Sequence, residues 1–182
     1  MSPSLDEMIA LFEQANSEFV KDEAENIASG VSERNLCGCM MLKLRRGLDQ
    51  SPYADYFVDV EYNRNESGRL KTYVWGKLAP ITITCDLIVH SRGRNLIQDN
   101  LIAIEMKRHN HPKEAKDSDK LRLKCLTRDS FDDIWSFDGK SLPEHVCRYI
   151  LGVYYELNSE KRQVAVRYYV KGAMLREYTL KF

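Results

Sequence analysis

The chain has 182 residues, of which 43% are hydrophobic and 30% are charged, and its formal net charge is zero. This length suits one compact domain with a real core and is short for two, so we expect a single domain over residues 1–182. No apolar run approaches the ~20 residues of a membrane helix, and the acidic, amphipathic start is unlike a signal peptide, so a cytoplasmic protein without a membrane partner is expected. Five cysteines without a repeated Cys-x-x-Cys spacing predict reduced, mostly buried thiols.

The first predicted helix is capped by Ser4 and runs to about Val20, after which a polar connection leads to the next helix. The second helix begins at Ser32, repeats its apolar residues at three- and four-residue spacing, and is expected to stop at Gly47. Counting back along the buried face of this second helix leads to Glu33. A carboxylate is therefore predicted at the head of the core-facing stripe.

Strand-like runs follow at Tyr56–Asn63, Arg69–Trp75, Ile81–His90 and Asn100–Lys107. The last two are nearly continuous apolar runs, which is typical of central strands covered on both faces. The pattern then becomes helical over 113–128 and again, more briefly, over 130–137. The chain ends in further predicted strands at Arg148–Leu157, Arg162–Val170 and Met174–Phe182. This order predicts an α/β fold with a mixed β-sheet flanked by helices.

Charge is unevenly distributed along the chain. Seven of the 27 acidic residues but only one of the 27 basic residues lie in residues 1–30, so the remainder carries 20 acids and 26 bases, a net of +6. We therefore distinguish an acidic helical leader (1–30), a core (32–157) and a C-terminal β extension (158–182). The leader is expected to dock on the basic body or to help form a dimer interface.

Two charged side chains end the apolar run "NLIAIEMKR" at Asn100–Arg108. Glu105 and Lys107 project from the same face, because side chains alternate across a strand. Asp86 interrupts the preceding apolar run, and the short turn between the two runs predicts adjacent strands that bring Asp86 near Glu105. Two carboxylates in a weakly solvated site repel each other unless a cation lies between them or one is protonated.

A hard divalent ion, Mg²⁺ with Mn²⁺ able to substitute, is the simplest partner for such a pair. Lys107 beside the ion would orient or deprotonate a water for attack on a phosphodiester, and Glu33 is a candidate further carboxylate. The group Asp86, Glu105, Lys107 and Glu33 therefore predicts a metal-dependent hydrolase site.

In these segments the sequence resembles the PD-(D/E)XK nuclease superfamily, the restriction-endonuclease-like fold. The matching elements are "ITCDLIVH", then "IEMK" with its glutamate nineteen residues after Asp86, and the preceding helix "SERNLCGCMMLKL". The resemblance covers about Ser32 to Thr127, with Tyr149–Glu156 as the next core strand, and is closest in character to small bacterial and prophage members. Cys85 stands where the name-giving motif has proline, a position that contributes no metal ligand.

The resemblance implies an αβββαβ core, to which this chain would add C-terminal strands. It also implies a magnesium ion bound by Asp86, Glu105 and the backbone carbonyl of Met106, with Lys107 near the attacking water. Glu33 occupies the position where many members carry an extra acidic residue.

Other residues have two interpretations. Glu61 is an alternative to Glu33 as the extra carboxylate, although it also fits a half-exposed strand. His90, on the same strand face as Asp86, and Arg92 in the following turn are candidates for phosphate contact, the alternative being a structural histidine. Basic residues also recur every four positions along the third helix, either as a phosphate-facing ridge or as a solvated face: Lys116, Lys120, Lys124 and Arg128.

The expected function is that of a metal-dependent nuclease, specifically a DNA endonuclease, and a homodimer is expected because many nucleases of this fold pair two sites. The alternative is a catalytically silent nucleic-acid-binding or regulatory protein in which Glu105 and Lys107 form a structural ion pair. Intact Asp86, Glu105 and Lys107 favour the nuclease. The zero net charge favours the alternative, because affinity for phosphate normally comes from a basic surface. DNA or RNA, strandedness and sequence specificity stay open.

Overall fold

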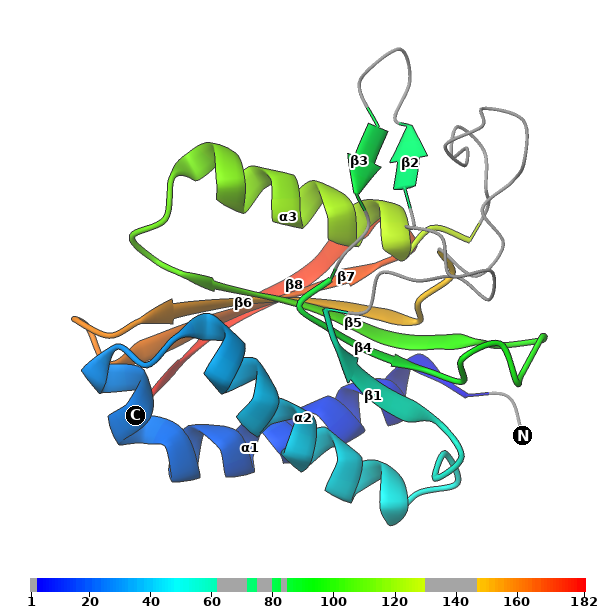
Figure 1. The fold of residues 1–182 in the computed structure, drawn as a ribbon, viewed down its shortest axis with the longest axis horizontal. Helices are drawn as coiled ribbons and strands as arrows, with labels where there is room; N and C mark the ends of the chain where they lie inside the picture. The colour runs from blue at the N-terminus through cyan, green and yellow to red at the C-terminus, as the bar shows by residue number, and fades with distance from the viewer. Residues whose placement is uncertain (1–2, 62–71, 75–79, 83–84, 130–146) are drawn as a thin grey trace.

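The computed structural model describes residues 3–61, 72–74, 80–82, 85–129 and 147–182. Its centre is a six-stranded mixed sheet, with helices α1 and α2 on one face and α3 on the other (Figure 1). The helices are α1 (Leu5–Ser29), α2 (Glu33–Asp49) and α3 (Lys113–Leu126). The predicted α/β fold with a mixed sheet flanked by helices is confirmed.

The sheet has the strand order β1-β4-β5-β6-β7-β8, in which only the β5–β6 pair is parallel. These strands are β1 (Phe57–Val60), β4 (Leu87–His90), β5 (Asn100–Arg108), β6 (Leu151–Asn158), β7 (Gln163–Val170) and β8 (Ala173–Lys181). A separate antiparallel pair is formed by β2 (Thr72–Val74) and β3 (Pro80–Thr82). Helix α3 connects the parallel strands β5 and β6, as a crossover connection should.

The prediction of one strand over Ile81–His90 is wrong. Residues 80–82 pair with β2, whereas β4 begins only at Leu87, after a bend at Asp86. A carboxylate oxygen of Asp86 accepts the backbone N–H of Met106 at 2.8 Å, which in a regular ladder would bond a backbone carbonyl. The predicted helix over 130–137 and the ends of the predicted strands over 56–63 and 69–75 lie outside the described residues.

Helix α1 is longer than the sequence predicted, because it continues beyond Val20 to Ser29. Its start is fixed by the predicted cap, in which Ser4 and Glu7 form a reciprocal capping box, and it ends at Gly30, whose φ is 86°. Ile27 in the added turns is fully buried. The polar residues around it form a solvated face, so the weak apolar periodicity reflects a wide polar face rather than a connection.

Gly47 does not stop α2, which continues to Asp49. A Cβ atom at this position would lie 2.7 Å from Leu11 Cδ1 of α1. The glycine therefore lets the two helices pack closely, which is a role that its sequence context alone does not distinguish from a helix stop.

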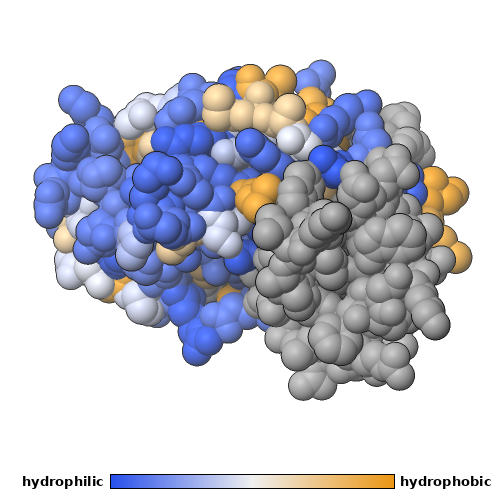
Figure 2. All heavy atoms as spheres, turned by 90° about the horizontal axis from the view of Figure 1, so that it is seen from above, coloured by the Kyte–Doolittle hydropathy of each residue, from blue (hydrophilic) through white to orange (hydrophobic). Residues whose placement is uncertain are grey.

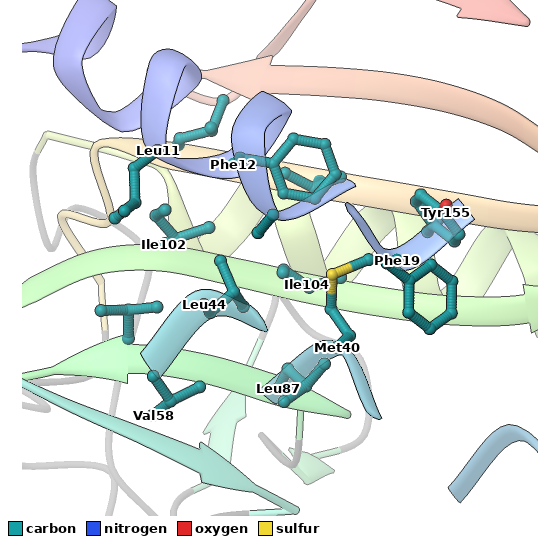
Figure 3. Packing of buried hydrophobic residues seen from close by; sticks show 14 of the residues in the cluster. Leu11, Phe12, Phe19, Met40, Leu44, Val58, Leu87, Ile102, Ile104 and Tyr155 are labelled. Carbon is teal, nitrogen blue, oxygen red and sulfur yellow. The ribbon is translucent and has the colours of Figure 1, made fainter. Parts of the chain in front are cut away.

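The main core lies between the α1–α2 layer and the sheet. Figure 3 shows side chains of α1 and α2 packed against strands β1, β4, β5 and β6: Leu11, Phe12, Phe19, Met40, Leu44, Val58, Leu87, Ile102, Ile104 and Tyr155. A smaller apolar cluster on the other face includes Ala103 of β5 and Leu123 of α3. Since Ile102 and Ile104 face α1 and α2, the alternation of β5 directs Glu105 and Lys107 to the α3 face.

The acidic first helix docks on the body of the protein. Its buried residues Met8, Phe12 and Phe19 belong to the main core. Its carboxylates form ion pairs with basic residues of α2, β8 and the β6–β7 turn: Glu13 with Arg176, Glu18 with Arg46, Asp22 with Lys43 and Glu25 with Arg162. Among the described helices, none is both long and apolar enough to span a membrane. All five cysteines carry free thiols, as predicted.

Candidate functional site

Asp86, Glu105 and Lys107 come together at the junction of β4 and β5. The antiparallel register pairs Leu87 with Ile104, so Asp86 lies beside the residues that follow Ile104. The 2.8 Å hydrogen bond from Met106 N to Asp86 Oδ2 fixes this contact. Burial raises the pKa of Asp86, although that hydrogen bond and the nearby Lys107 oppose the shift. The predicted adjacency of the two strands is confirmed.

Glu105 is buried, with only 1% of its surface exposed. Its Oε1 accepts a hydrogen bond of 2.5 Å from Arg122 Nη1 and a weaker one of 3.2 Å from Cys85 Sγ. Burial raises the pKa of Glu105 to about 8, and Asp86 and Asp119 add to the shift while Arg122 opposes it. Burial thus outweighs the contact with arginine and favours the protonated form of this carboxyl group.

Lys107 lies between two carboxylates. Its Nζ is 3.1 Å from Asp119 Oδ2 and 4.0 Å from Glu33 Oε2. Burial alone would lower the pKa of this amine, but Asp119, Asp86 and Glu33 outweigh burial and hold the pKa above its usual value. Lys107 is consequently an ammonium ion in this arrangement.

Glu33 is the first residue of α2, directly after its cap Ser32. Its Oε1 accepts the backbone N–H of Arg108 at 2.7 Å and lies 3.3 Å from His111 Nε2, which ties the start of α2 to the end of β5. The alternative carboxylate, Glu61, instead forms a two-point ion pair of 2.9 and 2.7 Å with the exposed Arg34. The structure thus brings Glu33 to Lys107 and directs Glu61 elsewhere.

Two site residues on α3 were missed by the sequence interpretation. Asp119 and Arg122 lie three residues apart, 3.3 Å from each other, and contact Lys107 and Glu105 respectively. The signal was present, because positions 119, 122, 123 and 126 form one helical stripe that also carries the buried Leu123 and Leu126. Charged residues that share a helix face with buried leucines are expected to be paired with other charges, for a structural or a functional reason.

Each of three carboxylates uses one oxygen for a protein donor, namely Glu33 Oε1, Asp86 Oδ2 and Glu105 Oε1. Their second oxygens accept no hydrogen bond from the part of the chain that the structure describes. With Asp119, four carboxylates from the described ranges gather here around the ion-paired Lys107 and Arg122. Within the described ranges, no group of three or more His, Cys, Asp or Glu side chains is already arranged to hold a metal ion.

His90 and Arg92 are not part of this group. His90 is buried at the opposite end of β4, where its Nε2 lies 2.8 Å from Asp59 Oδ2. Arg92 bonds the same carboxylate and stacks on the ring of Phe57 at 4.2 Å. Burial opposes ionisation of Asp59, but His90 and Arg92 outweigh it and hold the pKa of this carboxyl well below its usual value. Both candidates for phosphate contact therefore contribute to a structural cluster around Asp59.

The basic residues of α3 lie along a hydrophilic surface, which Figure 2 shows on the α3 side of the molecule. Lys116 Nζ donates to the carbonyl of His109 at 2.9 Å and lies 3.5 Å from Glu156 Oε1. Lys120 pairs with Asp117 at 3.2 Å, and Lys124 is exposed. Much of the charge of the predicted ridge is thus already neutralised by neighbouring acids.

No family model, curated protein or solved structure matches this chain.

Proposed function

We propose that the protein is a Mg²⁺-dependent nuclease of the PD-(D/E)XK type that cuts DNA as an endonuclease in the cytoplasm. The observation that carries the proposal is the meeting of Asp86, which directly precedes β4, with Glu105 and Lys107 of the adjacent strand β5, where acids outnumber bases among the described residues. The chain order α2, β1, β4, β5, α3 and β6, with β5 and β6 parallel, supports the αβββαβ core that such a nuclease requires.

The donor set fits a hard divalent ion. Asp86 and Glu105 would hold it together with the backbone carbonyl of Met106. Glu33, whose Oε2 lies 4.0 Å from Lys107 Nζ, is the further carboxylate. Mg²⁺ prefers such oxygen ligands and keeps several waters, so it does not need a cage made only of protein side chains. When bound, Mg²⁺ would supply Lewis-acid stabilisation of a phosphodiester oxygen and lower the pKa of a coordinated water.

Lys107 would act on the attacking water. Its ammonium group, held by Asp119 at 3.1 Å, donates hydrogen bonds and orients a water oxygen. Proton abstraction by Lys107 would require the surrounding carboxylates to lose their hold on its proton, since they raise the pKa of the amine. We therefore assign orientation of the water, and stabilisation of negative charge on the phosphate, to Lys107.

One observation favours the catalytically silent alternative. Arg122 already bonds Glu105, and Lys107 already pairs with Asp119, so these four residues satisfy one another without a metal. A binding or regulatory protein would need no more than this. Asp86 lies outside these two contacts, and burial together with the neighbouring Asp119 and Glu33 raises its pKa, which favours a site that takes up a cation.

A cleavage assay on plasmid, linear duplex and single-stranded DNA with Mg²⁺ or Mn²⁺ tests the proposal. Asp86→Asn and Glu105→Gln keep the side-chain shapes and should abolish cleavage, whereas Glu114→Gln, at an exposed site in the first turn of α3, should not change it. Cleavage that survives in Asp86→Asn would refute the nuclease proposal. Measuring the mass in solution tests the proposed homodimer separately.

A further inference from the structure

Helix α3 contributes a pair of opposite charges to the α3 face of the sheet. Asp119 is 5% exposed, and Arg122 keeps only 15% of its side-chain surface. Both side chains are therefore largely withdrawn from water, which is unfavourable for charges unless they have specific partners. Their partners are Lys107 and Glu105, the two residues to which the proposed chemistry assigns the water and the ion.

The contacts alternate in sign. Arg122 Nη1 is 2.5 Å from Glu105 Oε1 and 3.3 Å from Asp119 Oδ1, while Asp119 Oδ2 is 3.1 Å from Lys107 Nζ. Each acid of one element thus contacts a base of the other, and the two α3 residues contact each other. We name the four residues Glu105, Arg122, Asp119 and Lys107 the charge network.

The network fixes each β5 side chain in a definite orientation. Arg122 and Cys85 both bond Oε1 of Glu105, so the carboxylate cannot rotate freely, and its Oε2, which accepts no hydrogen bond from the described residues, can take another ligand. Asp119 fixes the end of a long and flexible lysine chain, which otherwise has considerable rotamer freedom. Substitution of a group that orients a metal ligand typically lowers metal affinity or activity by ~10- to 100-fold.

We infer that α3 supplies two positioning residues, with Arg122 orienting Glu105 towards the ion and Asp119 orienting Lys107 towards the water. This inference rests on the proposed function and deepens it. It assigns the two residues to separate steps, because Arg122 contacts a proposed metal ligand and Asp119 contacts the lysine that does not bind metal.

The test compares wild type with Arg122→Gln and Asp119→Asn, and uses Lys113→Gln as control. Lys113 lies on the same helix in an exposed ion pair with Asp117, away from the network. Calorimetry measures the Mg²⁺ affinity of each folded protein, and cleavage of a DNA substrate at saturating Mg²⁺ gives kcat and KM. Thermal unfolding reports any general loss of structure.

Arg122→Gln should weaken Mg²⁺ affinity by about 10- to 100-fold. Asp119→Asn should leave Mg²⁺ affinity unchanged and lower kcat by a similar factor, with little change in KM. Lys113→Gln should behave as wild type. Arg122→Lys and Asp119→Glu keep the charges and should recover part of the respective losses; they also carry the test if either neutral variant fails to fold.

Folded variants with wild-type affinity and kcat, or with both quantities reduced alike in Arg122→Gln and Asp119→Asn, would overturn the inference while leaving the nuclease intact. A wild-type protein that neither binds Mg²⁺ nor cleaves DNA would overturn the proposed function as well.

Discussion

Glu105 should make the stability of the protein depend on pH in an unusual direction. Burial raises its pKa from the ordinary 4.5 to about 8 in the folded state. Between these two values the folded protein binds more protons than the unfolded chain, so the free energy of unfolding falls as pH rises. Since one pKa unit corresponds to about 1.4 kcal/mol, linkage over the interval from pH 5 to pH 8 amounts to about 3.5 kcal/mol.

Urea denaturation at constant temperature, in steps from pH 5 to pH 8.5 without divalent ions, measures this loss. Other groups titrate in the same interval, so the informative quantity is the difference between wild type and Glu105→Gln, which cannot ionise. Relative to wild type, the variant should gain stability steadily with pH. Saturating Mg²⁺ should flatten this difference, because a bound cation favours the ionised carboxylate. Parallel pH profiles of the two proteins would refute the raised pKa of the buried Glu105 carboxyl group.

Three further substitutions test the helix packing and the structural role of His90. In Gly38→Ala the added Cβ meets nothing within 4 Å, so this substitution should stabilise α2 by up to ~1 kcal/mol in chemical denaturation. In Gly47→Ala the added Cβ would lie 2.7 Å from Leu11, so the same gain in helix propensity should be lost. Equal effects of the two substitutions on stability would contradict the packing role of Gly47. Asp59→Asn should lower stability by about 1–3 kcal/mol, because it weakens the bonds to His90 and Arg92, and should leave the rate of DNA cleavage per folded molecule unchanged. A selective loss of cleavage in Asp59→Asn would return His90 to the functional site.

The sequence predicted those parts of the fold that follow from alternation and capping. The face shared by Glu105 and Lys107 follows from the two-residue period of a strand, and the adjacency of Asp86 follows from a short antiparallel turn. Ser4 was predicted as a cap because its hydroxyl satisfies a helix N–H group locally, and the predicted start of the second helix at Ser32 falls on the observed cap of α2. All of these depend on neighbours in the sequence.

The features that the sequence did not reveal depend on contacts between distant segments. Gly47 is an interior helix residue because Leu11 packs against it, and nothing in its own neighbourhood records that contact. Asp119 and Arg122 were hidden among the charges of a polar helix until the sheet beneath supplied Glu105 and Lys107. His90 shares a strand with Asp86 but bonds Asp59 of β1, so its role was set by a strand 31 residues earlier.

The central claim is that Asp86 and Glu105 form a divalent-cation site, and calorimetric titration of Mg²⁺ and Mn²⁺ tests it most directly. Wild type and Glu114→Gln should both bind Mg²⁺ and Mn²⁺, and for each ion the two proteins should have the same affinity, whether DNA is present or not. Glu105→Ala should lose ion binding and DNA cleavage together. Wild-type protein that binds neither ion in the presence or absence of DNA would contradict the claim, and would leave Glu105 and Lys107 as members of a structural charge network.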